Sequence, residues 1–301
     1  MSEIKKIMIE SQKQGLAIPA FNIPYLPMLA PIVQAAKEED AFVLIQAARA
    51  DWEKFEADSP EAVAKEFEKY ADERHAKLHL DHIPVIDEDG YAVEYMELLR
   101  RAVACGFQSV MLDASRLGVD ENMKLTKEAV EYVHSYQVPL EAELGTVMGH
   151  EATGLPPYEE LFRSKKGFTK VEDAKRYVQE TKCDWLSVAI GSIHGALQEE
   201  IASCEKPKAR LDIEHLQKIK AAVNIPIVLH GGSGIEPGYI RDGIRAGIAK
   251  INIGTEIRQA YLRTLKEGGG IRKAQASVYQ TVCCCIENVL QVSGSASRLC
   301  S

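Results

Sequence analysis

The chain alternates short apolar runs with longer segments in which apolar residues recur every three to four positions. The apolar runs are rich in Val, Ile and Leu and are bounded by polar turns, which is typical of buried β-strands. Eight such runs predict strands at residues 19–23, 42–47, 78–82, 109–115, 139–145, 184–191, 225–230 and 248–253.

The segments between these runs have the periodicity of amphipathic helices. Leu29, Ile32 and Ala36, for example, fall on one face of a helix predicted at 28–39. Further helices are predicted at 60–74, 92–104, 120–136, 171–181, 213–223 and 236–246. Alternating strands and helices indicate a parallel sheet, and eight units fit a closed barrel better than an open sheet. We therefore predict an α/β fold, a (β/α)8 (TIM) barrel that forms a single domain over residues 1–301.

Two long stretches depart from this repeat, at about 146–170 and 196–210. Each follows the C-terminal end of a predicted strand, where barrels place their active sites. A long loop in a compact domain is usually functional and often serves as a lid. A variable surface insertion is the alternative, above all for the second loop.

The composition restricts the class of protein. Of the 301 residues 46% are hydrophobic and 27% charged, as in a soluble globular protein. The net charge of −8 argues against nucleic acid or an anionic membrane as a partner. The N-terminus lacks the apolar core of a signal peptide, and no run of the chain approaches the length of a membrane span. We expect a cytoplasmic protein.

Polar side chains gather at the ends of the predicted strands. They are Asn22, Asp81, His82, Asp113, Glu141, Glu143, His194, His230 and Asn252. Because a barrel brings these strand ends to one face, three histidines from three strands should stand beside several carboxylates. Taken singly, each histidine would be read as structural. Together they predict a catalytic metal site with a position left open for substrate.

Three glycine-rich stretches indicate a second function for the same face. They are Gly-Ser-Ile-His-Gly at 191–195, His-Gly-Gly-Ser-Gly at 230–234 and Asn-Ile-Gly-Thr at 252–255. Glycine lets the backbone approach an anion closely, and the loops after the last strands of a barrel are the usual phosphate site. Two of these stretches contain a candidate metal ligand, so metal and phosphate should bind side by side.

These motifs, in this order, resemble class II, metal-dependent, fructose-bisphosphate and tagatose-bisphosphate aldolases. The resemblance covers nearly the whole chain, and it also rests on residues 18–22 (IPAFN), 79–82 (HLDH), 109–115 (SVMLDAS) and 141–145 (EAELG). It implies a lyase of carbohydrate metabolism, as in glycolysis, that reversibly cleaves a ketose 1,6-bisphosphate to dihydroxyacetone phosphate and an aldehyde such as glyceraldehyde 3-phosphate.

The resemblance also implies roles for single residues. By the family pattern the catalytic Zn²⁺, or another divalent ion, is held by His82, His194 and His230, with Glu143 and Asp113 near a second metal position. Asp81 is implied as the acid/base at the aldehyde oxygen, and Glu151 as the carboxylate that moves the proton at the nucleophilic carbon. The implied phosphate-binding residues are Gly195, Gly232, Ser233 and Thr255, and those implied to contact the substrate are Asn22 and Asn252. A monovalent cation (Na⁺ or K⁺) near the glycines and a homodimer or homotetramer also follow from the family.

The chain departs from the family pattern at the far end of the substrate. The departures are Ile83 with the run that follows it to Gly90, Arg116, Gly254 and Met148. Arg258 and Arg116 are candidates to bind a second phosphate or another anion, and surface arginines are the alternative for both.

Several functions remain open on the sequence alone. Fructose 1,6-bisphosphate is the first candidate substrate, ahead of tagatose 1,6-bisphosphate or another phosphorylated ketose or deoxy-sugar acid. Other classes are a metal-dependent barrel hydrolase and a non-catalytic sugar-phosphate binder. Lys250 shares a strand face with Asn252 and could form a Schiff base, but the intact metal set argues against that chemistry.

Overall fold

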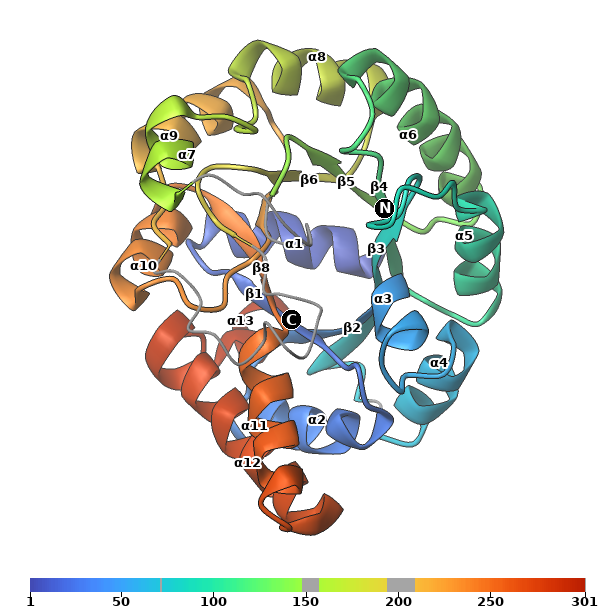
Figure 1. Cartoon of the computed structure of the whole chain (residues 1–301), viewed down its shortest axis with the longest axis vertical. Coiled ribbons are helices and arrows are strands. Elements are labelled where there is room, and N and C mark those ends of the chain that lie inside the picture. Colours follow the sequence, from blue (N-terminus) through green and yellow to red (C-terminus); the bar gives the residue numbers. More distant parts are fainter. Residues whose placement is uncertain (71, 148–156, 194–208, 301) are drawn as a thin grey trace.

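The computed structural model describes residues 1–70, 72–147, 157–193 and 209–300, and within them eight parallel strands close into a barrel. Each strand pairs with the next along the chain, and β8 pairs with β1 (Figure 1). The strands are β1 (Ile18–Asn22), β2 (Val43–Ala48), β3 (Ala76–Pro84), β4 (Ser109–Asp113), β5 (Leu140–Leu144), β6 (Trp185–Val188), β7 (Ile227–Leu229) and β8 (Ile248–Ile253). The predicted (β/α)8 barrel is confirmed.

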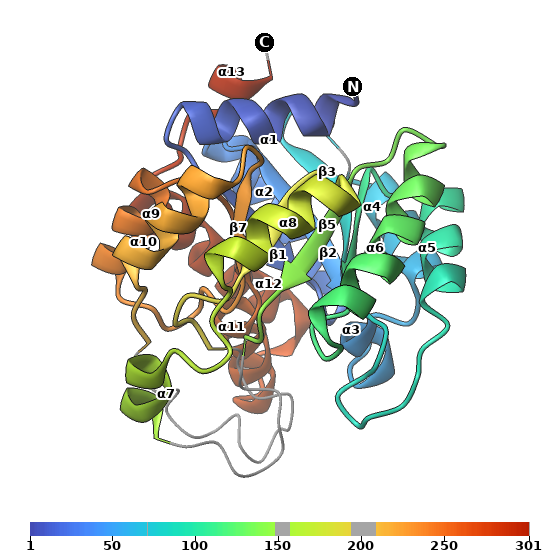
Figure 2. The same cartoon turned by 90° about the horizontal axis from the view of Figure 1, so that it is seen from above.

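Helices surround the barrel on the outside (Figure 1). They are α2 (Leu29–Glu38), α3 (Arg49–Glu53), α4 (Pro60–Glu68), α5 (Tyr95–Ala104), α6 (Val119–His134), α7 (Tyr158–Ser164), α8 (Val171–Thr181), α9 (Ile213–Ala222), α10 (Pro237–Arg245), α11 (Thr255–Lys266) and α12 (Gly270–Cys284). A 3-10 turn, η1 (Leu26–Met28), precedes α2, and a π-helical turn, η2 (Cys285–Leu290), follows α12. Two further helices, α1 (Glu3–Lys13) and α13 (Ser295–Leu299), lie together across one end of the barrel, near both chain termini (Figure 2). No helix of the described segments is long and apolar enough to cross a bilayer.

The alternation of side chains along the strands explains how this sequence builds both a hydrophobic core and a polar site. Successive side chains of a strand point to opposite faces. Along β8, Ile251 and Ile253 alternate with Lys250 and Asn252, and all four side chains are buried. The polar pair faces the barrel interior, because it contacts Asp81 of β3 across it.

The structure corrects several of the predicted boundaries. The predicted strands ended at residues 145 and 191, but the glycines there have φ angles of +89° and +114° and lie outside β5 and β6. Strand β3 continues past its predicted end at His82 to Pro84. The predicted loop at 146–170 contains the short helix α7, while most of the predicted loop at 196–210 lies outside the described residues.

Candidate active site

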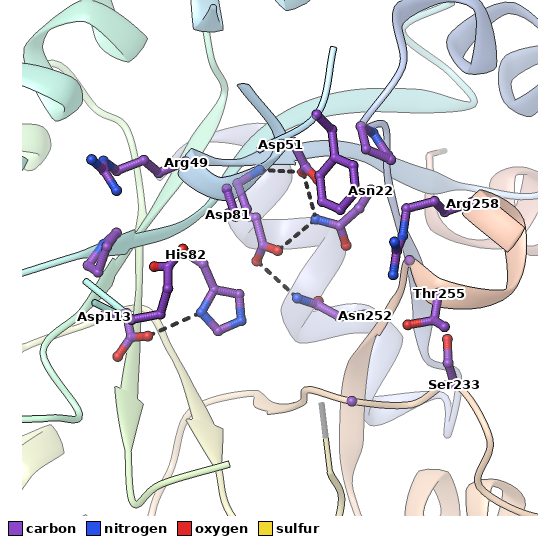
Figure 3. A pocket seen from close by; sticks show the side chains of 18 of the residues that line it. Asn22, Arg49, Asp51, Asp81, His82, Asp113, Ser233, Asn252, Thr255 and Arg258 are labelled. Atoms are coloured by element: carbon purple, nitrogen blue, oxygen red, sulfur yellow. Dashed lines mark hydrogen bonds and ion pairs between the residues drawn. The ribbon is translucent and has the colours of Figure 1, made fainter. Parts of the chain in front are cut away.

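A pocket opens at the C-terminal ends of the strands, where the polar residues of the sequence were expected to meet (Figure 3). Its lining includes Asn22, Arg49, Asp51, Phe55, Asp81, His82, Asp113, Arg116, Ser233, Asn252, Thr255 and Arg258. The described strands β1, β2, β3, β4 and β8 therefore each deliver a polar side chain to the pocket at their ends or just beyond. The predicted convergence of strand ends is what produces the site.

His82 owes its position to an irregular backbone in β3. Its φ angle is +36°, and the pairing of β3 with β4 shifts register between Leu80 and Ile83. A non-glycine residue in this region is strained, and such strain persists where the surrounding structure holds it. The turned backbone leaves His82 Nδ1 3.2 Å from Asp113 Oδ2 and 4.0 Å from Glu143 Oε2.

His230 follows β7 directly and meets His82 inside the barrel. The two imidazole rings have centroids 4.4 Å apart. The side chain of His230 is fully buried, with Nδ1 3.3 Å from Glu143 Oε2 and Nε2 2.8 Å from Glu141 Oε1. His194, the third predicted histidine, lies outside the described residues.

Two overlapping groups of side chains could hold a metal ion. Asp81, His82 and His230 each offer a ligand atom within 4.8 Å of the others, and so do His82, Asp113 and Glu143. Imidazole nitrogens with carboxylate oxygens are a donor set that zinc takes readily. The donor set therefore fits the divalent ion that the sequence predicts, with His82 common to both groups.

The electrostatics of these groups also favour a cation. Burial alone would lower the pKa of His82, but Asp81 and the hydrogen-bonded Asp113 outweigh it and raise the pKa to about 10. Burial and the charge of Asp113 together raise the pKa of Glu143. Several carboxylates thus compete for positive charge at this point of the pocket, which is the charge that a divalent ion supplies.

The carboxylate of Asp81 is held by three amide groups, of which Figure 3 shows those of Asn22 and Asn252. Its Oδ1 accepts a hydrogen bond from Asn252 Nδ2 at 2.9 Å, and its Oδ2 accepts from Asn22 Nδ2 at 3.0 Å and Gln46 Nε2 at 3.2 Å. Burial would raise the pKa of Asp81, but the charges of His82 and other neighbours lower it to about 2. Asp81 is therefore an ionised carboxylate in a fixed orientation. Gln46 was missed by the sequence analysis, although it is the polar residue in the otherwise apolar strand β2.

The loops after β7 and β8 meet closely on the other side of the pocket. A Cβ atom on Gly232 would lie 2.6 Å from Ile251 Cγ2 and 3.0 Å from the carbonyl oxygen of Asn252, so this approach requires glycine. Ser233 follows in the same loop, and Gly234 N–H donates to Glu256 Oε1 at 3.2 Å. Helix α11 begins at Thr255, so its N-terminal N–H groups lie beside these loops, an arrangement that favours anions. Gly195 lies outside the described residues.

Charged side chains of both signs also line the pocket, and one of them, Arg258, follows Thr255 by three residues in helix α11 (Figure 3). The guanidinium of Arg258 is largely buried and lies over the ring of Phe55, 4.8 Å from its centroid. Asp51 is also buried, and its Oδ2 accepts hydrogen bonds from the backbone N–H of Ala48 at 2.8 Å and from Asn22 at 3.4 Å. Asp51 and Phe55 carried no signal in the sequence, because they belong to the short helix α3 and the bend that follows it.

The unusual run after His82 forms a wall of the same pocket. Ile86 makes an antiparallel bridge to Ala92, and Asp87 Oδ1 between them accepts the N–H groups of Asp89 and Tyr91. Asp87 also pairs with Arg49 at 3.4 Å. The run is thus a tight loop tied to the segment after β2.

The structure brings most of the predicted site residues together. Those that line the pocket or lie directly behind it are Asn22, Asp81, His82, Asp113, Glu143, His230, Gly232, Ser233, Asn252, Thr255 and Arg258. Glu151, like the predicted His194 and Gly195, lies outside the described residues. The expected monovalent cation and oligomer stay predictions.

Comparisons with known proteins agree with this geometry. Residues 2–298 match the family model described as fructose-bisphosphate aldolase class-II. A fructose-bisphosphate aldolase from Helicobacter pylori is 31% identical over 293 residues, which cover 90% of this chain and 88% of that protein. The solved structure of the YdjI aldolase from Escherichia coli K12 is 28% identical with a TM-score of 0.75, covering 98% of this chain and 99% of that one. Fructose-bisphosphate aldolase from Campylobacter jejuni, 21% identical with a TM-score of 0.71 over 98% of this chain and 96% of that one, shares the fold.

Proposed function

The chain belongs to the class II fructose-bisphosphate aldolase family, and from that premise we propose that it reversibly cleaves fructose 1,6-bisphosphate to dihydroxyacetone phosphate and glyceraldehyde 3-phosphate. The family consists of lyases that generally depend on zinc. The observation that carries the proposal is Asp81, an ionised carboxylate held by three amides beside His82 and His230.

The metal site would use the histidines that converge in the pocket. His82 and His230, with His194 as the third ligand by family resemblance, would hold the zinc ion, and Asp113 and Glu143 would serve a second metal position. When bound, the ion supplies a Lewis acid that stabilises negative charge on the substrate oxygens.

The protein groups then move the protons. Asp81 takes the proton of the C4 hydroxyl as the C3–C4 bond breaks, and returns it in the direction of synthesis. Its fixed orientation comes from Asn22 and Asn252, which also contact the substrate. Glu151 exchanges the proton at the nucleophilic carbon of dihydroxyacetone phosphate.

The two phosphates of the substrate bind along the wall of the pocket that includes the start of helix α11. The donor phosphate binds at Ser233 and Thr255, where N–H groups of the helix α11 terminus and the close-packed glycine loops favour an anion. Gly195 and Gly232 complete that cradle. The second phosphate pairs with the guanidinium of Arg258.

A Schiff-base mechanism has no suitable amine at Lys250. Its side chain is fully buried, and its Nζ lies 2.8 Å from Glu141 Oε2. An ammonium group committed to a buried ion pair is a poor nucleophile.

The test separates the two halves of the reaction. Zinc-loaded protein is incubated with dihydroxyacetone phosphate in D2O and deuterium entry at the hydroxymethyl carbon is followed by NMR, while cleavage of fructose 1,6-bisphosphate and tagatose 1,6-bisphosphate is assayed in parallel. Asp81→Asn should lower cleavage by about 10²- to 10⁴-fold, the usual contribution of a general acid/base, and retain exchange. Glu151→Gln should abolish exchange.

Faster cleavage of tagatose 1,6-bisphosphate would mean that the substrate is this C4 epimer of fructose 1,6-bisphosphate. An absence of exchange and of cleavage of both substrates in zinc-loaded protein would refute the proposed function. Arg258→Ala should raise KM for the bisphosphate. Its matched control is Arg245→Ala, which removes an exposed arginine that pairs with Asp242 outside the pocket lining and should leave KM unchanged.

A further inference from the structure

Below the metal site, the barrel interior contains a second group of ionisable side chains, here called the buried ion cluster: His79 of β3, Glu141 of β5 and Lys250 of β8. All three are fully buried. Lys250 Nζ lies 2.8 Å from Glu141 Oε2, 3.4 Å from His79 Nε2 and 4.0 Å from Asp81 Oδ1. Three strands that are not neighbours in the barrel therefore meet at one ammonium group.

The ammonium occupies a place that resembles a metal site. Ligand atoms of His79, Asp81 and Glu141 lie within 4.8 Å of one another, as they would around an ion. A buried charge is costly unless it is paired and hydrogen-bonded. Lys250 supplies that pairing, so it acts as a built-in cation for these carboxylates.

Both oxygens of Glu141 have defined partners. Oε2 faces Lys250 and also accepts from Trp185 Nε1 at 2.6 Å, while Oε1 lies 2.8 Å from His230 Nε2. A carboxylate paired with an ammonium can only accept hydrogen bonds. His230 Nε2 must therefore carry a proton, so Nδ1, which lies 3.3 Å from Glu143 Oε2, is the ring nitrogen that can ligate a metal.

His79 takes the other side of the ammonium. Its Nε2 accepts from Lys250, and its Nδ1 lies 2.8 Å from Ser109 Oγ. Burial, followed by the charge of Lys250, lowers the pKa of His79 to about 3, so the ring is neutral. His79 orients the ammonium and is not available as a metal ligand.

We propose that Lys250 is a positioning residue of the metal site: it anchors Glu141, and Glu141 holds His230 with Nδ1 directed at the metal. The inference rests on the proposed role of His230 as a ligand. Partners that orient a ligating histidine typically contribute 10- to 100-fold to metal affinity. Lys250 would raise the metal affinity indirectly, through Glu141, without contacting substrate or metal.

The experiment measures zinc affinity by competition with a chromophoric chelator, together with the visible spectrum of the Co²⁺-substituted protein. Lys250→Met and Glu141→Gln should each weaken zinc binding by about 10- to 100-fold and shift the cobalt bands. Ser109→Ala is the matched control, because it removes a polar atom of the same buried layer that contacts His79 and not Glu141. It should bind zinc as the unaltered protein does.

A further measurement needs no variant. ¹⁵N-histidine NMR of the zinc-loaded unaltered protein should show His230 protonated at Nε2. Protonation at Nδ1, or variants that fold and bind zinc within about threefold of the unaltered protein, would overturn the inference while leaving the proposed function intact. Failure of the unaltered protein itself to bind zinc would instead overturn the proposed function.

Discussion

Replacing Asp51 by Asn should stabilise the protein near pH 7 and have little effect near pH 4. The carboxylate of Asp51 is buried, and burial raises its pKa from 3.8 to about 6, against the lowering effect of the hydrogen bond from Ala48 N–H. One oxygen, Oδ2, accepts hydrogen bonds from both Ala48 N–H and Asn22 Nδ2, so the amide oxygen of Asn can accept both in the same place.

The sign follows from proton linkage. The folded protein keeps the Asp51 proton up to about pH 6, whereas the unfolded chain loses it near pH 3.8. Between these values the folded state binds more protons, so the free energy of unfolding falls as the pH rises and stays reduced above about pH 6. A pKa difference of about two units, at about 1.4 kcal/mol each, corresponds to roughly 3 kcal/mol. The amide does not ionise, so the variant escapes this loss.

Urea denaturation of both proteins between about pH 4.5 and pH 8, at equal metal loading, measures the difference. The advantage of Asp51→Asn should grow through about pH 6. A difference that is constant or shrinks with pH would refute the reasoning. Asp212→Asn is the control with the opposite slope. The pKa of Asp212 is lowered: burial opposes this, but Lys165 Nζ at 2.8 Å and His215 N–H at 2.9 Å outweigh it. Asp212→Asn should have a smaller free energy of unfolding than the unaltered protein near pH 7, and this difference should shrink as the pH falls.

Removal of divalent metal with a chelator should abolish release of glyceraldehyde 3-phosphate, and zinc should restore it; activity that survives thorough chelation would contradict the zinc site. Gln46→Met should lower kcat roughly ten- to a hundredfold, because a hydrogen bond to a charged group such as Asp81 contributes about 1.5–3 kcal/mol; steady-state kinetics with unchanged kcat would count against it. Gly232→Ala should weaken binding of dihydroxyacetone phosphate, measured by calorimetry, since the new Cβ would lie 3.0 Å from the Asn252 carbonyl oxygen. Gly238→Ala, with no atom within 4 Å of the added Cβ, should bind normally.

The barrel could be predicted because its strands and helices repeat with different periods. All eight predicted strands overlap observed ones, and the misplaced ends are at residues such as Gly145 and Gly191, whose positive φ angles end the strand early. Helices α3 and α7 have five and seven residues, too few for an apolar period to be visible. Helices α11 and α12 were not predicted, because they follow the last strand and no later strand in the sequence sets their limits.

The pocket residues could be predicted at strand ends but less well between them. A barrel topology alone places Asn22 and Asn252 on the same face as Asp81. The backbone of His82, with its φ angle of +36°, depends on how β3 pairs with β4, and a single sequence does not reveal pairing. Asp51 was not found because helix α3, which carries it into the pocket, is too short to show a period in the sequence.

The barrel interior is built in two layers, and the period of two along each strand connects them. Asp81, Glu143 and Asn252 form the upper layer beside the pocket, and two residues earlier on the same strands His79, Glu141 and Lys250 form the lower one. Two residues of a strand advance by about 6–7 Å, so the lower layer lies directly beneath the upper one, and none of its three residues lines the pocket. In the sequence those three positions resemble ordinary core residues or spare catalytic groups. Only the closed barrel shows that β3, β5 and β8 direct them to one point, where an ammonium and a carboxylate support a histidine of the layer above.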